Sequence, residues 1–385
     1  MTTRFIRSVM LLLIGASMLT GAAAFAQRRA APTTIRDLPM HANGWDTLMG
    51  TAEFKDHNGR PAIVFEKEGI VAPKGLTFAN GTVEFDVEPA AMGAGLLFRV
   101  QSLETLEMVY FRPQADCASR PDCVQYAPFT RGVLLWDLFP QYQAAAPLRA
   151  NEWNHVKVVV SGERMQLFVN GATTPTLAVG RLEGDTKDGR VAFVGPGAFA
   201  NVRITPDAVE GLAKDALPDS TSRDGRLVRQ WQLASFSELP DGKEPTIADL
   251  PGASSEWRGL TAERGGLINV TRVFGLPAKR PLRSLTWLKT TISSKTNQSK
   301  KVAIGWSREI WVFVNGQRVF ADKNLFMPAS ARKAPDGRLS LENGSFVLPL
   351  QAGDNEVVVA LANNFYGWGL ILRLEDLDGI QLARK

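Results

Sequence analysis

The sequence is poor in the residue types that bind metals or crosslink a chain. Its 385 residues include two cysteines, three histidines and four tyrosines. His41, His57 and His155 stand far apart and in no ligand spacing, so we predict no zinc site. A calcium site usually draws on a dense acidic loop, which the sequence lacks. We therefore predict no metal and no cofactor, although structural calcium stays compatible with the sequence.

Signatures of several common protein classes are also missing. The chain has no Gly-x-Ser-x-Gly motif, no phosphate-binding loop and no dinucleotide fingerprint. Lysine and arginine are scattered, and the formal net charge is only +5. No basic stripe therefore indicates a nucleic-acid partner.

The two cysteines, Cys117 and Cys123, lie close together in the chain. In an oxidising compartment such a pair should form a disulfide. The bond would close a short loop and contribute about 2 kcal/mol to stability, so its main effect is to fix that loop. A two-cysteine metal clip is the alternative, but it would need two further ligands that the histidines do not supply.

The first residues have the pattern of an export signal. Arg4 and Arg7 precede a short apolar run at 9–19, and Ala24-Phe-Ala26 is a small-x-small cleavage site. The run is short for a membrane span, and no later apolar stretch is long enough to cross a bilayer. We expect a mature protein that starts at Gln27, has no membrane span and is periplasmic or secreted.

Alternating apolar and polar residues, typical of β-strands, dominate the rest of the chain. Residues 82–87 and 108–112 alternate in this way, and the runs at 156–160 and 165–169 flank a turn. Asn170-Gly171 marks a further turn. Short strands separated by such turns favour antiparallel sandwiches. We therefore predict an all-β protein with two antiparallel β-sandwich domains of the jelly-roll kind.

The domain boundaries follow from composition. A stretch rich in Asp, Ser, Gly and Pro interrupts the β-pattern at 215–226, as linkers do, and residues 206–214 are compatible with a short helix before it. We predict the following segments: a signal peptide at 1–26, a flexible lead-in at 27–40, a first sandwich at 41–205, a linker at 206–226 and a second sandwich at 227–385.

The first predicted sandwich contains a recognisable hairpin. Trp153-Asn-His-Val-Lys-Val, a glycine at 162 and then Leu167-Phe-Val-Asn-Gly171 resemble a hairpin of laminin-G-like and concanavalin A-like jelly rolls. Residues 81–87 are similar to an early strand of these folds, and 189–195 with 199–204 are similar to their closing strands. The 3-keto-disaccharide hydrolase-like domains share this layout. The resemblance implies a fold that hosts lectins, glycosidases and adhesive modules.

The second predicted sandwich resembles galactose-binding-like domains, such as those attached to many glycosidases. The resemblance rests on Trp311-Val-Phe-Val-Asn-Gly-Gln-Arg-Val-Phe320 and on the strand pair at 346–359. It implies a domain that is either sugar-binding or structural.

In three early strands, which carry Glu84 with Asp86, Arg99, and Tyr110 with Arg112, polar side chains occupy alternate positions and apolar side chains occupy the positions between them. Side chains of equal parity share a sheet face. If these strands form a meander, one polar face carries Glu84, Asp86, Arg99, Tyr110 and Arg112. Such a face suits sugar hydroxyls or the carboxylate of a uronic acid. The alternative is a solvated sheet face with weak ion pairs.

Glu84, Asp86 and Glu88 also resemble the acid motif of family 16 glycoside hydrolases. Neighbouring acids on one strand face lie ~6.5–7 Å apart at Cα. That spacing is compatible with the ~5–5.5 Å between carboxyl groups in a retaining pair. The motif therefore supports a glycoside hydrolase, or an enzyme that processes 3-keto-glycosides, as an alternative to simple binding.

Aromatic residues supply further candidates for sugar stacking. Tyr126, Trp136 and Tyr142 are candidates that flank the predicted disulfide loop, and that loop is a candidate for one wall of a groove. In the second domain, Tyr366 is the candidate, because Trp368 shares parity with core leucines.

These observations favour an exported, non-catalytic carbohydrate-binding protein. The alternatives are the enzyme described above and a structural or adhesion module. A close carboxylate pair in a deep groove would favour the enzyme, and a shallow aromatic face would favour the binder. A surface without a groove would favour the structural module. No feature of the sequence identifies the glycan or the oligomeric state.

Overall fold

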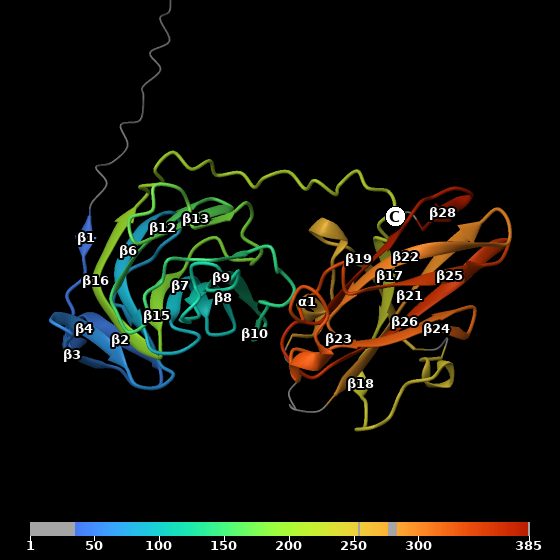
Figure 1. Ribbon diagram of the computed structural model, residues 1–385, viewed down its shortest axis with the longest axis horizontal. Helices are drawn as coiled ribbons and strands as arrows, with labels where there is room; N and C mark the ends of the chain where they lie inside the picture. Colours follow the sequence, from blue (N-terminus) through green and yellow to red (C-terminus); the bar gives the residue numbers. More distant parts are fainter. Residues whose placement is uncertain (1–34, 253–254, 276–282, 384–385) are drawn as a thin grey trace, which may run out of the picture. The chain divides into compact units, whose positions relative to one another are not determined.

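The protein is all-β and forms two antiparallel β-sandwiches, as the sequence predicts (Figure 1). The computed structural model describes residues 35–252, 255–275 and 283–383. The predicted signal peptide and the first part of the lead-in therefore lie outside the described residues. No helix among the described residues is long and apolar enough to cross a membrane.

The first sandwich has two sheets, which we name the β6 sheet and the β8 sheet. The β6 sheet contains, in spatial order, β14 (Leu177–Val179), β13 (Arg164–Val169), β12 (Asn154–Ser161), β6 (Gly81–Pro89), β16 (Gly197–Pro206), β4 (Arg60–Phe65) and β3 (Glu53–His57), with β1 (Arg36–Asp37) beside β16. The β8 sheet contains β10 (Val133–Leu134), β9 (Val124–Thr130), β8 (Thr105–Phe111), β7 (Gly95–Ser102), β15 (Arg190–Val194), β5 (Ile70–Pro73) and β2 (Trp45–Met49), with β11 (Gln143–Ala144) beside β9.

The second sandwich also has two sheets. The larger contains β19 (Trp257–Thr261), β17 (Gln230–Ala234), β21 (Ser284–Ser294), β26 (Gly353–Asn363), β23 (Arg308–Val314) and β24 (Gln317–Asn324), with β18 (Ser237–Glu238) and β28 (Ile380–Leu382) beside β21. The smaller contains β20 (Ile268–Asn269), β27 (Gly369–Leu374), β22 (Gln298–Trp306) and β25 (Gly344–Leu350). The short helices are η1 (Ala42–Gly44), η2 (Ile247–Asp249), η3 (Arg264–Gly266), α1 (Thr271–Phe274) and η4 (Ala329–Ala331).

The apolar side chains that alternate along the strands form the core of the first sandwich, as the sequence predicts. Val83, Phe85 and Val87 of β6 are buried between the two sheets, as are Val109 and Phe111 of β8. The ring of Phe85 packs edge-on against Phe193 of β15 and at a tilt against Phe199 of β16. Because burial of apolar surface drives folding, this alternating register fixes which face of each strand points outward.

Two turn predictions are confirmed by backbone geometry. Asn170 and Gly171 follow β13 with positive φ angles of 51° and 74°. Asn315 and Gly316 connect β23 to β24 with φ angles of 48° and 82°. Two-residue hairpin turns need this left-handed backbone, which Asn and Gly adopt at low cost.

The three early strands do not form the meander on which the shared polar face depended. Strand β6 pairs with β12 and β16 in one sheet, whereas β7 and β8 pair with each other in the opposite sheet. Glu84 and Asp86 therefore do not share a face with Arg99, Tyr110 and Arg112. Alternation defines the two faces of each strand, but it carries no information on which strands become neighbours.

Two local predictions also differ from the structure. The described part of the lead-in is held in place, because β1 pairs with β16 and the Trp45 Nε1 donates to the carbonyl of Pro39 at 2.8 Å. Residues 206–214 form turns and no helix. Positive φ angles at Asp207, Glu210 and Gly211 interrupt the right-handed backbone that a helix needs. The predicted domain boundary at 206–226 stays a prediction.

Candidate functional site

A pocket of about 520 Å³ lies on the outer face of the β8 sheet. Its floor is apolar and comes from β5, β7, β8 and β15 through Ile70, Leu97, Leu106, Met108 and Val194. One wall comes from loops of the second sandwich and is made by Phe326, Phe365 and Tyr366. Both sandwiches therefore contribute side chains to one hollow, whose volume lies in the range typical of ligand sites.

Four residues selected from the sequence line this pocket: Tyr110, Arg112, Trp136 and Tyr366. The first two point to the outer face, as their parity predicts. The expectation that they are exposed is wrong, because Tyr110 is 3% and Arg112 7% exposed. Trp136 and the loops of the second sandwich cover this face, and strand periodicity cannot reveal which segments make this long-range contact.

A hydrogen-bonded chain connects the polar groups at this end of the pocket. The Tyr110 hydroxyl donates to Gln125 Oε1 at 2.9 Å and accepts from Arg112 Nη2 at 2.7 Å. Arg112 Nη1 donates to the same Gln125 oxygen at 2.7 Å, and Gln125 Nε2 donates to the Trp136 carbonyl at 2.8 Å. Burial raises the pKa of Tyr110, so the phenol stays neutral. These hydrogen bonds thus fix the neutral hydroxyl of Tyr110 and the guanidinium of Arg112 beside the indole ring of Trp136.

Trp136 is the centre of the aromatic part of the site. Its ring meets the rings of Phe326 and Tyr366 edge to face, with centroids 4.9 and 5.7 Å away. The guanidinium carbons of Arg112 and Arg338 lie 5.8 and 5.2 Å from the indole centroid. Cation–π attraction and edge contacts therefore hold the ring in one orientation.

A buried ion pair fixes the loop of the second sandwich that carries Tyr366. Arg308 Nη2 donates to Asp137 Oδ2, and both side chains are almost fully buried. The backbone N–H of Gly367 donates to the other oxygen of Asp137 at 3.0 Å. A Cβ atom at Gly367 would lie 2.5 Å from that oxygen, so this close approach requires glycine. Burial raises the pKa of Asp137, while the charge of Arg308 opposes the shift.

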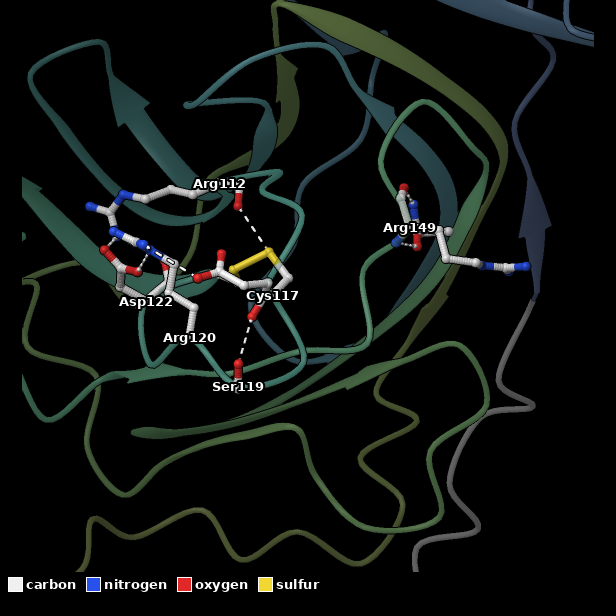
Figure 2. The surroundings of a disulfide bond; sticks show 9 residues. Arg112, Cys117, Ser119, Arg120, Asp122 and Arg149 are labelled. Carbon is white, nitrogen blue, oxygen red and sulfur yellow. Dashed lines mark hydrogen bonds and ion pairs between the residues drawn. A yellow bond between two sulfur atoms is a disulfide. The ribbon is translucent and has the colours of Figure 1, made fainter.

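The predicted disulfide between Cys117 and Cys123 is confirmed, with 5.4 Å between the Cα atoms. Figure 2 shows it beside Arg112 and Asp122. The Asp122 carbonyl accepts from Arg112 Nη1 at 3.0 Å, and the Arg112 N–H donates to the Cys123 carbonyl at 2.8 Å. The Cys117 sulfur also contacts the Arg112 carbonyl at 3.2 Å, although a disulfide sulfur has no hydrogen to donate. The crosslinked loop therefore positions Arg112.

Tyr126 and Tyr142 are buried and cannot stack on a sugar at the surface, so this part of the prediction is wrong. Both belong to the core of the first sandwich. The Tyr126 hydroxyl donates to Glu107 Oε2 at 2.7 Å, and the Tyr142 hydroxyl donates to Glu183 Oε1 at 2.8 Å. Tyr126 lies within β9 at a core-facing position and not in a loop, which explains the error.

Arg99 is also unavailable to a ligand at the surface. Its φ angle is 50°, at an irregularity in the pairing of β7 with β8, and its side chain is buried. Its guanidinium donates to the Ala79 carbonyl at 2.9 and 2.7 Å and to the Gly162 carbonyl at 2.7 Å. A bulge changes the direction of a side chain, so simple alternation misplaces it.

The acidic residues Glu84, Asp86 and Glu88 lie on the outer face of the β6 sheet, and none of them lines the pocket. Asp86 receives hydrogen bonds from Arg60, from Asn201 at 2.6 Å and from His155 at 2.9 Å. Burial opposes its ionisation, but these partners together lower its pKa.

The other two acids have histidine neighbours. Glu88 lies 3.2 Å from His57 Nε2, and Glu84 lies 3.8 Å from His155 Nε2. The acid ladder is therefore part of an ion-pair network. Because Asp86 is held as an anion, it is poorly suited to donate a proton to a leaving group.

Several pocket residues were not selected from the sequence, notably Met92, Phe326 and Phe365. One signal for a covered outer face was present. Residues 106–111 read Leu-Glu-Met-Val-Tyr-Phe, so both parities of β8 carry apolar side chains. A strand that is apolar on both faces is usually buried on both faces. No group of three or more His, Cys, Asp or Glu residues in the described part of the chain could hold a metal ion.

Comparisons with known proteins support the fold of the first sandwich. Residues 41–205 match the family model described as a 3-keto-alpha-glucoside-1,2-lyase-like domain. The predicted resemblance is thus confirmed for this part of the chain, whereas the galactose-binding-like resemblance of the second sandwich stays a prediction. No curated protein matches the chain.

Three solved structures illustrate the similarity. The carbohydrate-binding module CBM66 from Bacillus subtilis is 16% identical, with 43% of this chain and 100% of that chain covered and a TM-score of 0.33. A putative glycosyl hydrolase from Parabacteroides distasonis is 15% identical, with coverages of 42% and 88% and a TM-score of 0.29. Domain 4 of AbnA, a GH43 extracellular arabinanase from Geobacillus stearothermophilus, is 14% identical, with coverages of 46% and 84% and a TM-score of 0.31.

Proposed function

We propose that this protein is an exported carbohydrate-binding protein whose ligand site is the pocket on the outer face of the β8 sheet. The observation that carries the proposal is the convergence of Tyr110, Arg112, Trp136 and Tyr366 on one hollow. Tyr110 and Arg112 are near neighbours in the chain, but Trp136 and Tyr366 come from later segments, and together the four supply aromatic rings, a hydroxyl and a guanidinium. Aromatic rings can pack on the apolar face of a sugar, and forked donors bind its oxygens.

The lining of the pocket supports binding over hydrolysis. Glycoside hydrolysis by the usual route needs two carboxyl groups on either side of the scissile bond. Glu68 is the only acid among the described residues that line the pocket, and it lies at the exposed rim. The Glu84, Asp86 and Glu88 ladder lies on the other sheet of the sandwich. A hollow of this size also argues against a purely structural module.

A glycan array tests the proposal. The protein should be exported from a bacterial host, where a mass that starts at Gln27 would support the predicted signal cleavage. The array should include neutral glycans and glycans with uronic acids, and each hit should be assayed for released sugar. We expect hits without product release. Turnover of any hit would refute the non-catalytic role, and an array without hits would refute carbohydrate binding.

A matched pair of variants locates the site. Phe365→Ser changes a ring at the pocket rim that is 39% exposed, and Phe236→Ser changes a ring outside the pocket that is 41% exposed. Phe365 packs edge-on against Tyr366, and Phe236 packs edge-on against Phe274 and Trp368. We expect Phe365→Ser to weaken binding of an array hit about 5- to 30-fold, as loss of 1–2 kcal/mol does. Equal affinities of the two variants, measured by titration calorimetry, would place the ligand elsewhere.

A further inference from the structure

The pocket is more apolar than a site for a bare oligosaccharide needs to be. Its floor consists of aliphatic and thioether side chains, and its polar groups gather at one end around Tyr110 and Arg112. A sugar exposes hydroxyl groups on almost every side. A floor without hydrogen-bonding partners would therefore strip water from those hydroxyls without replacing it.

Exposed apolar side chains surround the same hollow. Eight large apolar side chains stay exposed in the described part of the chain, and three of them, Met92, Leu103 and Phe365, line this pocket. Single exposed apolar residues are normal, but a cluster around an apolar hollow marks a binding surface. Met92 and Met108 are unbranched and adaptable, so they can adjust to ligands of differing shape.

We propose that the natural ligand is a glycoside with an apolar aglycone, either alkyl or aromatic. The aglycone lies on the floor formed by Leu97, Leu106 and Met108, while the sugar faces Trp136 and Arg112. This inference rests on the proposed carbohydrate-binding function and names its ligand class. The separation of an apolar floor from a polar end matches a molecule with the same two parts, and about 520 Å³ suits a small ligand rather than a protein segment.

The test uses alkyl glycosides of increasing chain length. Methyl, butyl and hexyl β-D-glucopyranosides and the matching β-D-glucuronides are titrated into the mature protein by calorimetry. For at least one of the two sugars, affinity should rise roughly fourfold for each buried methylene until the pocket is full. Methyl glycoside alone and 1-hexanol alone should each bind more weakly than the hexyl glycoside.

Matched methionine variants connect the effect to this pocket. Met92 is 63% exposed and lines the pocket, and Met327 is 68% exposed and lies outside it. Each sulfur accepts an N–H from an arginine, at 3.4 and 3.5 Å. Met92→Gln should weaken the hexyl glycoside several-fold more than the methyl glycoside, which loses only what the contact of Met92 with Arg112 contributes, whereas Met327→Gln should change neither. Thermal melts confirm that both variants fold, as exposed substitutions should.

The outcomes separate this inference from the proposed function. If array glycans bind but affinity is independent of alkyl chain length, the aglycone inference fails and carbohydrate binding stands. If 1-hexanol binds as tightly as the hexyl glycosides, the sugar contributes nothing, and both proposals fail. If Met92→Gln and Met327→Gln weaken the hexyl glycoside equally, the apolar group binds elsewhere and the inference fails.

Discussion

The half-exposed His155 pairs with the buried Asp86, and the charge of this pair depends on pH. The hydrogen bond to Asp86 raises the pKa of His155, although partial burial opposes the shift. A histidine with a raised folded pKa stabilises the fold fully below its unfolded value near 6.5. That contribution is lost as the pH rises through the higher, folded value. Water screens the pair, so the effect on stability should be small.

We therefore predict that the melting temperature of the wild type falls more between about pH 6 and pH 8 than that of His155→Gln. His41 is an exposed histidine, so His41→Gln should follow the wild type. Thermal melts across this range test the prediction. Parallel profiles for the wild type and His155→Gln would show that the pair does not form in solution.

At the scale of single residues, the parity of a strand position predicts to which sheet face a side chain points better than it predicts whether that side chain is buried. Tyr110 and Arg112 point away from the core, as predicted, but they are covered by Trp136 and by loops of the second sandwich. Truncating Tyr110 would therefore remove a hydroxyl that serves Gln125 and Arg112, and would cost more than a surface change. Arg99 shows the other limit, because a local bulge overrides parity.

The disulfide loop is the element that joins the first sandwich to the polar end of the pocket. Its Asp122 carbonyl accepts from Arg112, and its Asp122 carboxylate lies 3.3 Å from Arg338 Nη2 of the second sandwich. Cleaving the crosslink frees a short segment in the unfolded chain, which costs about 2 kcal/mol of stability. It also removes the constraint on the groups that hold Arg112.

We predict that the double variant Cys117→Ser/Cys123→Ser stays folded but loses stability and binds an array glycan several-fold more weakly. Ser119→Ala is a control in the same loop, since it removes only one exposed hydrogen bond to the Asp116 carbonyl. Urea denaturation and calorimetry give the two readouts. Unchanged glycan affinity in the double variant would show that the crosslink does not position the site.

At the scale of strands, the turn signals at Asn170 and Asn315 were sufficient to predict a turn after β13 and a hairpin between β23 and β24. The meander failed because β6 pairs with strands that come much later in the chain. Hairpins are local and are encoded by turn residues, whereas such distant pairing depends on the packing of the whole core.

For the whole molecule, the all-β class and the two sandwiches follow from alternation along most of the chain. The ligand pocket does not, because it needs loops of the second sandwich to meet the β8 sheet. That contact includes Arg308 and Asp137, which are 171 residues apart in sequence. No local pattern marks either residue, yet their pairing holds the loop that carries Phe365 and Tyr366.

The buried pair of Arg308 and Asp137 should therefore contribute strongly to the contact between the two sandwiches, beside other pairs such as Asp122 with Arg338. Arg308→Met leaves a buried carboxylate without its cation and should destabilise the protein by about 3–5 kcal/mol. Arg308→Met/Asp137→Asn removes both charges and keeps an oxygen for the Gly367 N–H, so it should recover part of that loss. Arg318→Met breaks an exposed pair with Glu244 and should cost less than about 1 kcal/mol.

Urea denaturation of these three variants measures the differences, and glycan titration reports the pocket. Arg308→Met should weaken glycan binding as well, because Arg308 Nε also donates to the Phe365 carbonyl at 2.9 Å and thereby fixes the pocket wall. If Arg308→Met were no less stable than Arg318→Met, the buried pair would not exist in solution. A pocket wall supplied by the second sandwich would then lose a buried electrostatic support, and the ligand site would have to be sought on the β8 sheet alone.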